Sequence, residues 1–299
     1  MLGLSGLLLS LILVLSAPAV SEAYRPSWPL LNDIQGGEEW YMVRSKDSLY
    51  SIAGRFGTTW QTLAEKNRFS PPYKLSMGQK VLVNSRRIFP TARNIQDGLL
   101  LNIPEHGLYL IKQGAVVKRY PVGLGKPDWP TPTGQFSIMS KTKNPTWTIP
   151  KSIQEELKRE GRFIKEKIPP GPDNPLGSYW MALSVGGYGI HATIWPESIG
   201  HSTSHGCIRM ITEDIDDLFK QVNPGTSIQI VYEPLKLAQT ADDKIYLEAH
   251  SNTYQIQFSY LKHLQKLADQ KGLSERIDWP KAALVLNVRN GIAEEITRK

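Results

Sequence analysis

Cysteine is nearly absent from this chain, since Cys207 is the only one among 299 residues. A single thiol excludes any disulfide bond within the chain. A lone thiol is a liability in an oxidising compartment, so this residue is either buried and inert or retained for its chemistry. The sequence around Cys207 is needed to distinguish a buried, inert thiol from a reactive one.

Basic clusters with interleaved aromatic residues are also missing, although the formal net charge is +7 and the sequence pI is about 9.3. Nucleic-acid-binding domains gather Lys and Arg into such patches, so we predict no nucleic-acid partner. Scattered lysines form a solvated surface that is compatible with an anionic wall polymer. The hydrophobic fraction of 40% is typical of a soluble globular protein, and the length suffices for two or three domains.

Charge is absent from residues 2–20, where Leu, Ile, Val and Ala dominate. Ser21-Glu22-Ala23 follows, with small residues at the two positions that a signal peptidase reads. We therefore predict a signal peptide over residues 1–23 and an exported protein. No Lys or Arg precedes the apolar run, so an uncleaved membrane anchor is the alternative, and contact with a membrane is expected only in that case. No cysteine follows the run, which excludes a lipoprotein anchor.

Residues 39–84 have the pattern of a small strand–helix–helix–strand unit, after an extended lead-in over residues 24–38. The first helix is capped by Asp47 or Ser48 and ended by Gly57. Its apolar stripe consists of Leu49, Ile52, Ala53 and Phe56. The second helix is capped by Thr58 or Thr59 and ends near Asn67, and strands over residues 39–44 and 79–83 flank the pair.

The rest of the chain divides into three parts by composition. Residues 85–96 are predicted to be a linker. Residues 97–233 contain many short strands separated by Gly/Pro turns, which predicts a mostly β, sandwich-like or barrel-like domain with one helix capped by Thr212. Residues 234–299 are predicted to be a small α/β appendage, in which we identify no chemistry.

Cys207 stands in a sequence context that favours chemistry, Ser204-His205-Gly206-Cys207-Ile208-Arg209. A nearby histidine favours the thiolate, which is the reactive form of the side chain. Gly206 allows a substrate to approach the backbone closely. The N–H groups of Gly206 and Cys207 are candidates for an oxyanion hole.

A nucleophile needs a base, and three histidines are candidates: His191, His201 and His205. His191 follows a short strand, which is a rigid place for a catalytic group. A zinc site formed by Cys207 and these histidines is an alternative, although a second cysteine and a continuous helix are both missing. A buried structural cysteine, and a serine nucleophile at Ser204, are further alternatives.

Residues 39–84 resemble a LysM module, a family that binds glycans containing N-acetylglucosamine. The residues that carry this resemblance are Tyr41, Val43, Asp47, Ser48, Leu49, Ile52, Ala53, Phe56, Gly57, Leu63, Asn67 and Gly78-Gln79-Lys80-Val81. A glycan-binding role is implied by the family and by no single residue.

Residues 97–233 resemble the catalytic domain of a YkuD-type L,D-transpeptidase. The resemblance rests on His191, the motif Ser204–Arg209 and four upstream blocks: Pro121-Val122-Gly123, Thr131-Pro132-Thr133-Gly134, Asn144-Pro145-Thr146-Trp147 and Gly171-Pro172-Asp173-Asn174-Pro175-Leu176-Gly177. Together with the LysM-like unit and the C-terminal appendage, this organisation is similar to that of periplasmic members from Gram-negative bacteria.

The resemblance implies a role for each motif residue. Cys207 is the nucleophile and His191 the proton donor and acceptor. The backbone carbonyl of Ala192 orients the histidine ring. Ser204, His205 and Gly206 shape the oxyanion or substrate site. Arg209 anchors the motif through an ion pair or binds a substrate carboxylate.

The implied reaction acts on tetrapeptide stems of peptidoglycan through a thioester on Cys207 and needs no cofactor or metal. The acceptor is left open: a second stem gives a 3→3 cross-link, a lipoprotein lysine gives a wall anchor, and water makes the protein an L,D-carboxypeptidase. A cysteine hydrolase of unrelated amides and a non-catalytic wall-binding protein are the alternatives. The expected partners are the glycan strand and stem peptides, and the expected location is the periplasm.

Overall fold

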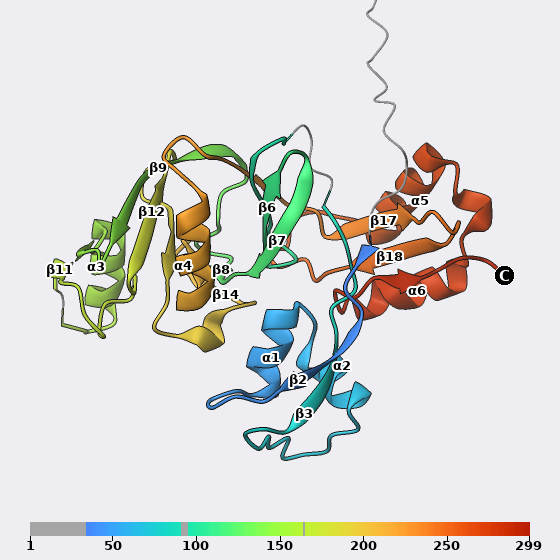
Figure 1. Cartoon of the computed structure of the whole chain (residues 1–299), viewed down its shortest axis with the longest axis horizontal. Coiled ribbons are helices and arrows are strands. Elements are labelled where there is room, and N and C mark those ends of the chain that lie inside the picture. Colours follow the sequence, from blue (N-terminus) through green and yellow to red (C-terminus); the bar gives the residue numbers. More distant parts are fainter. Residues whose placement is uncertain (1–33, 91–94, 164) are drawn as a thin grey trace, which may run out of the picture.

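The computed structural model describes residues 34–90, 95–163 and 165–299. The predicted signal peptide lies outside these ranges. Within them, no helix has both the length and the apolar character needed to cross a membrane. Three units follow one another along the chain (Figure 1), and strands predominate over helices, which confirms the predicted mostly β class.

The first unit contains β2 (Glu38–Met42), α1 (Leu49–Phe56), α2 (Trp60–Lys66) and β3 (Lys80–Asn84). The two strands pair antiparallel, with Tyr41 opposite Val81. Ser48 caps α1 through the N–H of Ser51, and Gly57 ends it with a φ of 59°. Thr59 caps α2. Both helices and both strands therefore confirm the prediction, because each carried a local capping or alternation signal.

The predicted linker over residues 85–96 is not a plain connection where the structure describes it. Arg87–Ile88 form β4, which pairs with β1 (Ile34–Gln35) of the lead-in. Both β4 side chains are buried. Two residues are too few for a periodic pattern, and for that reason the sequence did not reveal this strand.

The second unit is built on one curled, mixed sheet with the strand order β15-β13-β12-β9-β16-β5-β6-β7. Its strands are β5 (Gly98–Asn102), β6 (Gly107–Lys112), β7 (Ala115–Pro121), β9 (Gly134–Lys143), β12 (Tyr179–Leu183), β13 (Gly189–Ala192), β15 (Ile208–Met210) and β16 (Ser227–Val231). Their inward side chains form the largest core with the apolar face of α4 (Thr212–Gln221). Thr212 begins this helix without capping it, because the N-cap position belongs to Ile211 and no side chain bonds there.

Shorter elements surround the open end of this sheet. A small pair joins β8 (Leu124–Gly125) to β14 (Ser202–Ser204), and the turn η1 (Pro196–Ser198) precedes β14. A second pair joins β10 (Trp147–Thr148) to β11 (Lys167–Ile168), and between them lies α3 (Lys151–Arg159). The helix α3 has no buried residue, so it lies on the surface of the unit.

The third unit has its own core and a three-stranded sheet. Its strands are β17 (Leu235–Gln239), β18 (Ile245–Ala249) and β19 (Glu294–Glu295), and its helices are α5 (Tyr260–Lys271), η2 (Ser274–Arg276) and α6 (Trp279–Val288). The α/β prediction for this unit is correct.

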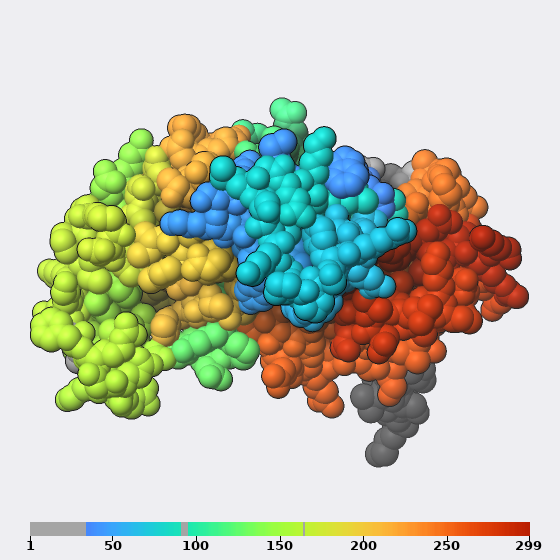
Figure 2. Space-filling model, turned by 90° about the horizontal axis from the view of Figure 1, so that it is seen from below, coloured from blue at the N-terminus to red at the C-terminus, as the bar shows by residue number. Residues whose placement is uncertain are grey.

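The first unit packs against both of the others. Seen from below, it covers the junction between the second unit and the C-terminal unit (Figure 2). The helix α1 contacts η1 and β7, and β4 contacts β17 and β18. The LysM-like unit is therefore docked on the rest of the described chain.

Candidate active site

The parallel pairing of β13 with β15 brings the two predicted catalytic residues to one end of the sheet. In this register His191 lies opposite Arg209, and Ile190 lies opposite Ile208. Cys207 immediately precedes β15, and its thiol contacts the chain just before β13, since Sγ donates to the Gly187 carbonyl at 3.7 Å. Residues that are 16 positions apart in the sequence thus meet through strand pairing.

Both residues line one pocket of about 890 Å³. Its aromatic walls include Trp129, Trp147, Phe163, Trp180, Tyr188 and Trp195. The elements α3 and β10 cover one side, and the turn before β15 forms another. A pocket of this size holds a peptide-sized ligand, with a few polar groups placed among apolar walls.

His191 is buried and its orientation is fixed by one hydrogen bond. Its Nδ1 lies 2.5 Å from the Ala192 carbonyl oxygen. A carbonyl only accepts, so Nδ1 carries the proton and Nε2 is left as the acceptor. Burial, with the nearby Arg209 charge, lowers the pKa of His191 to about 4. The ring is therefore neutral near pH 7 and able to take a proton.

Cys207 is held as a thiol. Burial raises the pKa of Cys207, and this effect outweighs a backbone hydrogen bond from Gly189 and the charge of Arg209. The sequence predicted that a nearby histidine would favour the thiolate, and the structure differs in this respect. His205, the neighbour in sequence, is turned to another partner, and neutral His191 supplies no positive charge.

The turn before Cys207 is tied by Ser204. Its hydroxyl donates to the Cys207 carbonyl at 2.6 Å and accepts the Gly206 N–H at 3.1 Å. Gly206 has a φ of 100°, and a Cβ there would lie 2.5 Å from the ring of Tyr188. The predicted oxyanion hole changes as a result, because the Gly206 N–H already has an acceptor and the Cys207 N–H is the donor that stays a candidate.

His205 joins the catalytic turn to the helix that covers the pocket. Its Nε2 lies 2.5 Å from one oxygen of Glu156 on α3, and Lys126 donates to the other oxygen at 2.8 Å. These two contacts lower the pKa of Glu156. Trp129 packs edge-on against His205 at 5.2 Å between ring centroids. His205 therefore orders the wall of the pocket and does not approach the thiol.

Arg209 points into the pocket without a carboxylate partner. Its guanidinium donates to the Thr203 hydroxyl at 3.2 Å, lies over the ring of Trp195 at 5.3 Å, and interacts through its charge with Cys207 and Glu197. Within the described residues, Nε of Arg209 is buried and has no hydrogen-bond partner. In the part of the chain that the structure describes, no ion pair of Arg209 is observed, and its side chain lines the cavity.

The four side chains of the zinc alternative do not converge. The ring of His201 stacks on Tyr50 of α1 at 3.6 Å, and His205 is bound to Glu156. His191, His205 and Cys207 line the pocket, but Nε2 of His205 is bound to Glu156 and Nδ1 of His191 to the Ala192 carbonyl. The structure therefore gives no support to a zinc site at these residues.

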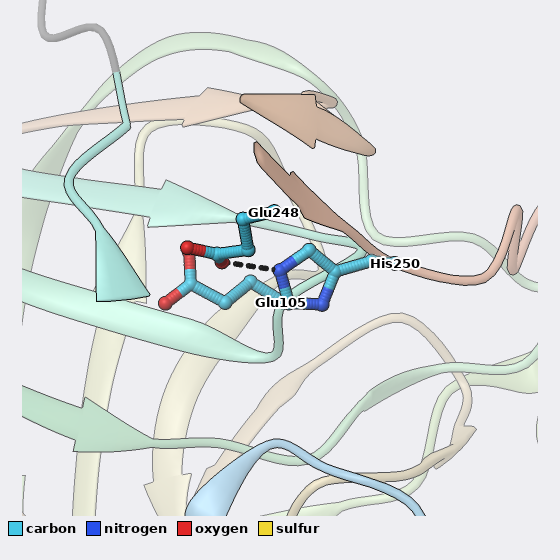
Figure 3. A group of neighbouring side chains, drawn as sticks. All are labelled: Glu105, Glu248 and His250. Atoms are coloured by element: carbon cyan, nitrogen blue, oxygen red, sulfur yellow. Dashed lines mark hydrogen bonds and ion pairs between the residues drawn. The ribbon is translucent and has the colours of Figure 1, made fainter. Parts of the chain in front are cut away.

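A different acidic group has metal-like spacing, and it lies between the units. Glu105, Glu248 and His250 bring their ligand atoms within 4.8 Å of one another (Figure 3). Lys236 occupies the centre of the group, with its ammonium 2.8 Å from Glu105 and 2.7 Å from Glu248. An ammonium in this position already supplies the cation, so these residues do not fit a metal ion.

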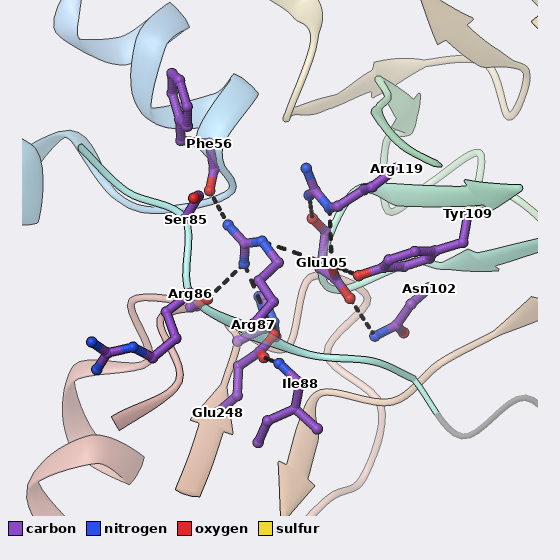
Figure 4. A network of polar contacts seen from close by, with 12 residues as sticks. Phe56, Ser85, Arg86, Arg87, Ile88, Asn102, Glu105, Tyr109, Arg119 and Glu248 are labelled. Carbon is purple, nitrogen blue, oxygen red and sulfur yellow. Dashed lines mark hydrogen bonds and ion pairs between the residues drawn. The ribbon is translucent and has the colours of Figure 1, made fainter. Parts of the chain in front are cut away.

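Arg87 and Arg119 complete this network (Figure 4). Arg119 pairs with Glu105 at 3.1 Å. Arg87 donates to the carbonyls of Phe56 and Gly291, which belong to the first and third units. The Lys236 and arginine charges hold the pKa of Glu105 well below its usual range in spite of burial. The network is thus a structural joint between the three units.

Glu156, Lys126 and Thr131 are parts of the site whose roles the sequence did not reveal. Glu156 stands among several charged residues of a surface helix, where nothing distinguishes it from Glu155. Thr131 belongs to the block Thr131-Pro132-Thr133-Gly134, which resembles the family. Its hydrogen bond to the Gly206 carbonyl depends on tertiary structure and has no signal in the sequence.

Comparisons with known proteins identify two families in the chain. The family described as "L,D-transpeptidase catalytic domain" matches residues 96–230, and the LysM domain matches residues 41–84. The chain is 31% identical to Probable L,D-transpeptidase YcfS of Escherichia coli over 75% of this chain and 72% of that protein. It is 31% identical to Probable L,D-transpeptidase ErfK/SrfK of Salmonella typhimurium over 68% of this chain and 65% of that protein.

A solved L,D-transpeptidase from Mycobacterium smegmatis is also similar, at 22% identity and a TM-score of 0.38. The similarity covers 52% of this chain and 64% of that one.

Proposed function

The chain belongs to the L,D-transpeptidase family, and from this premise we propose that it remodels peptidoglycan with Cys207 as nucleophile and His191 as base. The observation that carries this proposal is the shared pocket of the two residues, with Nδ1 of His191 bonded to Ala192 and Nε2 left as the acceptor. A neutral imidazole beside a neutral thiol is the starting state that proton transfer requires.

In the first half-reaction, Cys207 gives its proton to Nε2 of His191, and Sγ attacks the carbonyl carbon of meso-diaminopimelate in its bond to the terminal D-alanine of a tetrapeptide stem. The electron pair of the carbonyl moves to oxygen, where the Cys207 N–H is the candidate donor. When the carbonyl re-forms, the C–N bond breaks. The imidazolium returns the proton to the leaving amine of D-alanine, and a thioester stays on Cys207.

In the second half-reaction, an acceptor amine attacks the thioester. The new C–N bond forms, the C–S bond breaks, and His191 takes a proton from the amine and gives it to the departing sulfur, which restores the thiol. A diaminopimelate side chain as acceptor gives a 3→3 cross-link, and a lipoprotein lysine gives a wall anchor. Water as acceptor gives an L,D-carboxypeptidase.

Arg209 is proposed to bind a carboxylate of the stem peptide. Its guanidinium borders the pocket, and within the described residues its buried Nε has no partner. A guanidinium matches a carboxylate in a bidentate geometry, and such contacts fix orientation as well as supply energy. The stem carries carboxylates close to the scissile bond, so this contact would orient the donor.

The LysM-like unit is proposed to bind the glycan and hold the enzyme on its polymeric substrate. A bound glycan raises the local concentration of the attached stem peptides. Because this unit is docked through α1, the glycan would be held in a defined orientation to the pocket. This function places the protein at the cell wall, and with the apolar run of residues 2–20 we propose export to the periplasm.

The test is mass spectrometry of the protein after incubation with disaccharide-tetrapeptide, for wild type and Cys207→Ala. Loss of D-alanine with cross-linked dimers, absent in the variant, would support transpeptidation. Loss of D-alanine that yields only tripeptide would indicate carboxypeptidase activity or a missing lipoprotein acceptor. Folded, reduced protein that forms neither product nor thioester would overturn the proposal and favour a non-catalytic wall-binding protein.

A further inference from the structure

Tyr254 reaches from the C-terminal unit into the catalytic unit, behind the turn that carries Cys207. It lies in the loop between β18 and α5. Its hydroxyl accepts the N–H of Thr131 at 3.0 Å and donates to the carbonyl of Gly125 at 3.1 Å. One hydroxyl therefore satisfies a donor and an acceptor on two segments of the catalytic unit.

Thr131 carries this contact onward to the catalytic turn. Its Oγ1 donates to the Gly206 carbonyl at 2.9 Å and accepts the Gly125 N–H at 3.0 Å. Thr131 is buried, so each of these groups would otherwise have to be satisfied away from water. A continuous chain of hydrogen bonds thus runs from Tyr254 through Thr131 to Gly206, next to the nucleophile.

The backbones of Gly125 and Gly206 lie so close together that no side chain fits between them. A Cβ on Gly125 would lie 2.8 Å from the Cα of Gly206. A Cβ on Gly206 would strike Tyr188. Backbone pairing of β8 with β14 joins these segments at Ser204, and the hydroxyls of Thr131 and Tyr254 add the side-chain hydrogen bonds that tie Gly125 and Gly206 together.

Tyr254 is itself held by Tyr232, which follows β16 at the end of the catalytic unit. Its N–H donates to the Tyr232 hydroxyl at 3.0 Å, and that hydroxyl donates to Asn252 at 2.7 Å. The rings of Tyr232 and Tyr254 lie 5.7 Å apart. Tyr254 also packs against the core of the catalytic unit. These contacts fix the loop and hold the Tyr254 hydroxyl against the catalytic unit.

None of the described residues 234–299 lines the Cys207 pocket. We propose that Tyr254 is a positioning residue, whose hydroxyl holds the Gly125–Thr131 segment and through it the Gly206 carbonyl, so that the C-terminal unit fixes the position of Cys207. This gives the C-terminal unit a part in the reaction. The expected change in kcat rests on the proposed function, whereas the expected change in hydrogen exchange does not.

The test compares Tyr254→Phe with Tyr260→Phe in the full chain. Tyr260 is a matched control, because its hydroxyl donates to the His250 carbonyl within the C-terminal unit at 2.5 Å. In Tyr254→Phe, amide hydrogen exchange over residues 204–208 should rise roughly fivefold or more, since two buried backbone groups lose their partner. The kcat on disaccharide-tetrapeptide should fall about tenfold, with KM within about twofold. Tyr260→Phe should change neither quantity.

Unchanged exchange over residues 204–208 in folded Tyr254→Phe would overturn the proposal, as would equal effects of the two variants. If Tyr254→Phe does not fold, Thr131→Val removes the next hydroxyl in the chain and should give the same two changes, whereas Thr131→Ser should restore both. A wild-type protein without turnover would refute the proposed function, and the exchange comparison would still decide the role of Tyr254.

Discussion

At the scale of single residues, the main feature of the site is that burial favours the neutral forms of both proposed catalytic groups, His191 and Cys207. It lowers the pKa of His191 to about 4 and raises that of Cys207. A stable thiolate–imidazolium pair at rest would need the opposite shifts. The proposed mechanism therefore has the thiolate form only when a substrate is in place, and a thiol kept neutral at rest reacts less readily with oxidants.

This has a testable consequence for the pH dependence of Cys207 alkylation. Only the thiolate reacts with iodoacetamide, and its fraction rises through the thiol pKa. Since that pKa is raised above its ordinary value, the midpoint of rate against pH should lie above the value of about 8.5 for a free cysteine. The same protein in urea should show the ordinary midpoint. A folded-state plateau that extends below pH 7 would contradict a neutral pair.

The sequence revealed the identity of the site residues better than their contacts. Cys207 and His191 were identifiable because their types and spacing match the family, and the strand register explains how they meet. Glu156, which binds His205, carries no local signal because its neighbour Glu155 is also acidic. Such contacts depend on how a surface helix packs, and packing has no signature in a single sequence.

At the scale of elements, short-range signals explain which predictions were correct. The helices α1 and α2 had both caps and apolar stripes, and they form where expected. The strand β17 was not predicted, because its side chains are mostly buried on both faces and its sequence does not alternate. Strand β4 was missed because it is stabilised by tertiary pairing alone.

The docking of α1 depends on the absence of a side chain at Gly54. A Cβ there would lie 2.5 Å from the Ile199 carbonyl, and Gly200 packs against the same helix turn. In an exposed helix Gly→Ala is stabilising by about 1 kcal/mol. Here we expect Gly54→Ala to destabilise the full chain by roughly 1–3 kcal/mol, since the clash is with backbone and outweighs the gain in helix propensity. Urea unfolding measures the difference.

Gly37→Ala is the matched control for this prediction. A Cβ on Gly37 meets nothing within 4 Å, so this change in the same unit should leave the unfolding free energy within about 0.5 kcal/mol. A stabilising effect of Gly54→Ala would mean that α1 does not sit against Ile199 in solution, and the fixed orientation of the LysM-like unit would have to be abandoned.

At the scale of the whole molecule, a network of buried charges joins the three units, beside a small apolar cluster of Ile88, Ala238 and Ala293. Glu105 comes from the catalytic unit, and Glu248 and Lys236 come from the C-terminal unit. Lys236 also donates to the Ile88 carbonyl in the former linker region. Buried ion pairs contribute little net stability when intact, but they require every partner to be present, which makes the arrangement of the units specific.

Removal of the central cation tests this joint. Lys236→Met keeps much of the side-chain volume but leaves two buried carboxylates without their shared ammonium. We expect a loss of roughly 3–5 kcal/mol in the free energy of unfolding, measured in urea near pH 7. Lys66→Met removes a lysine from an exposed ion pair with Glu38 and should shift the urea midpoint far less.

A second substitution separates the electrostatic cause from a packing defect. Adding Glu105→Gln to Lys236→Met removes one of the two uncompensated charges, so part of the lost stability should return if repulsion and desolvation of carboxylates cause the loss. Arg119 would lose its own partner at 3.1 Å, so the recovery should be partial. Additive losses in the double variant would instead assign the effect to packing. The buried charges would then be incidental to the way in which the LysM-like, catalytic and C-terminal units hold together.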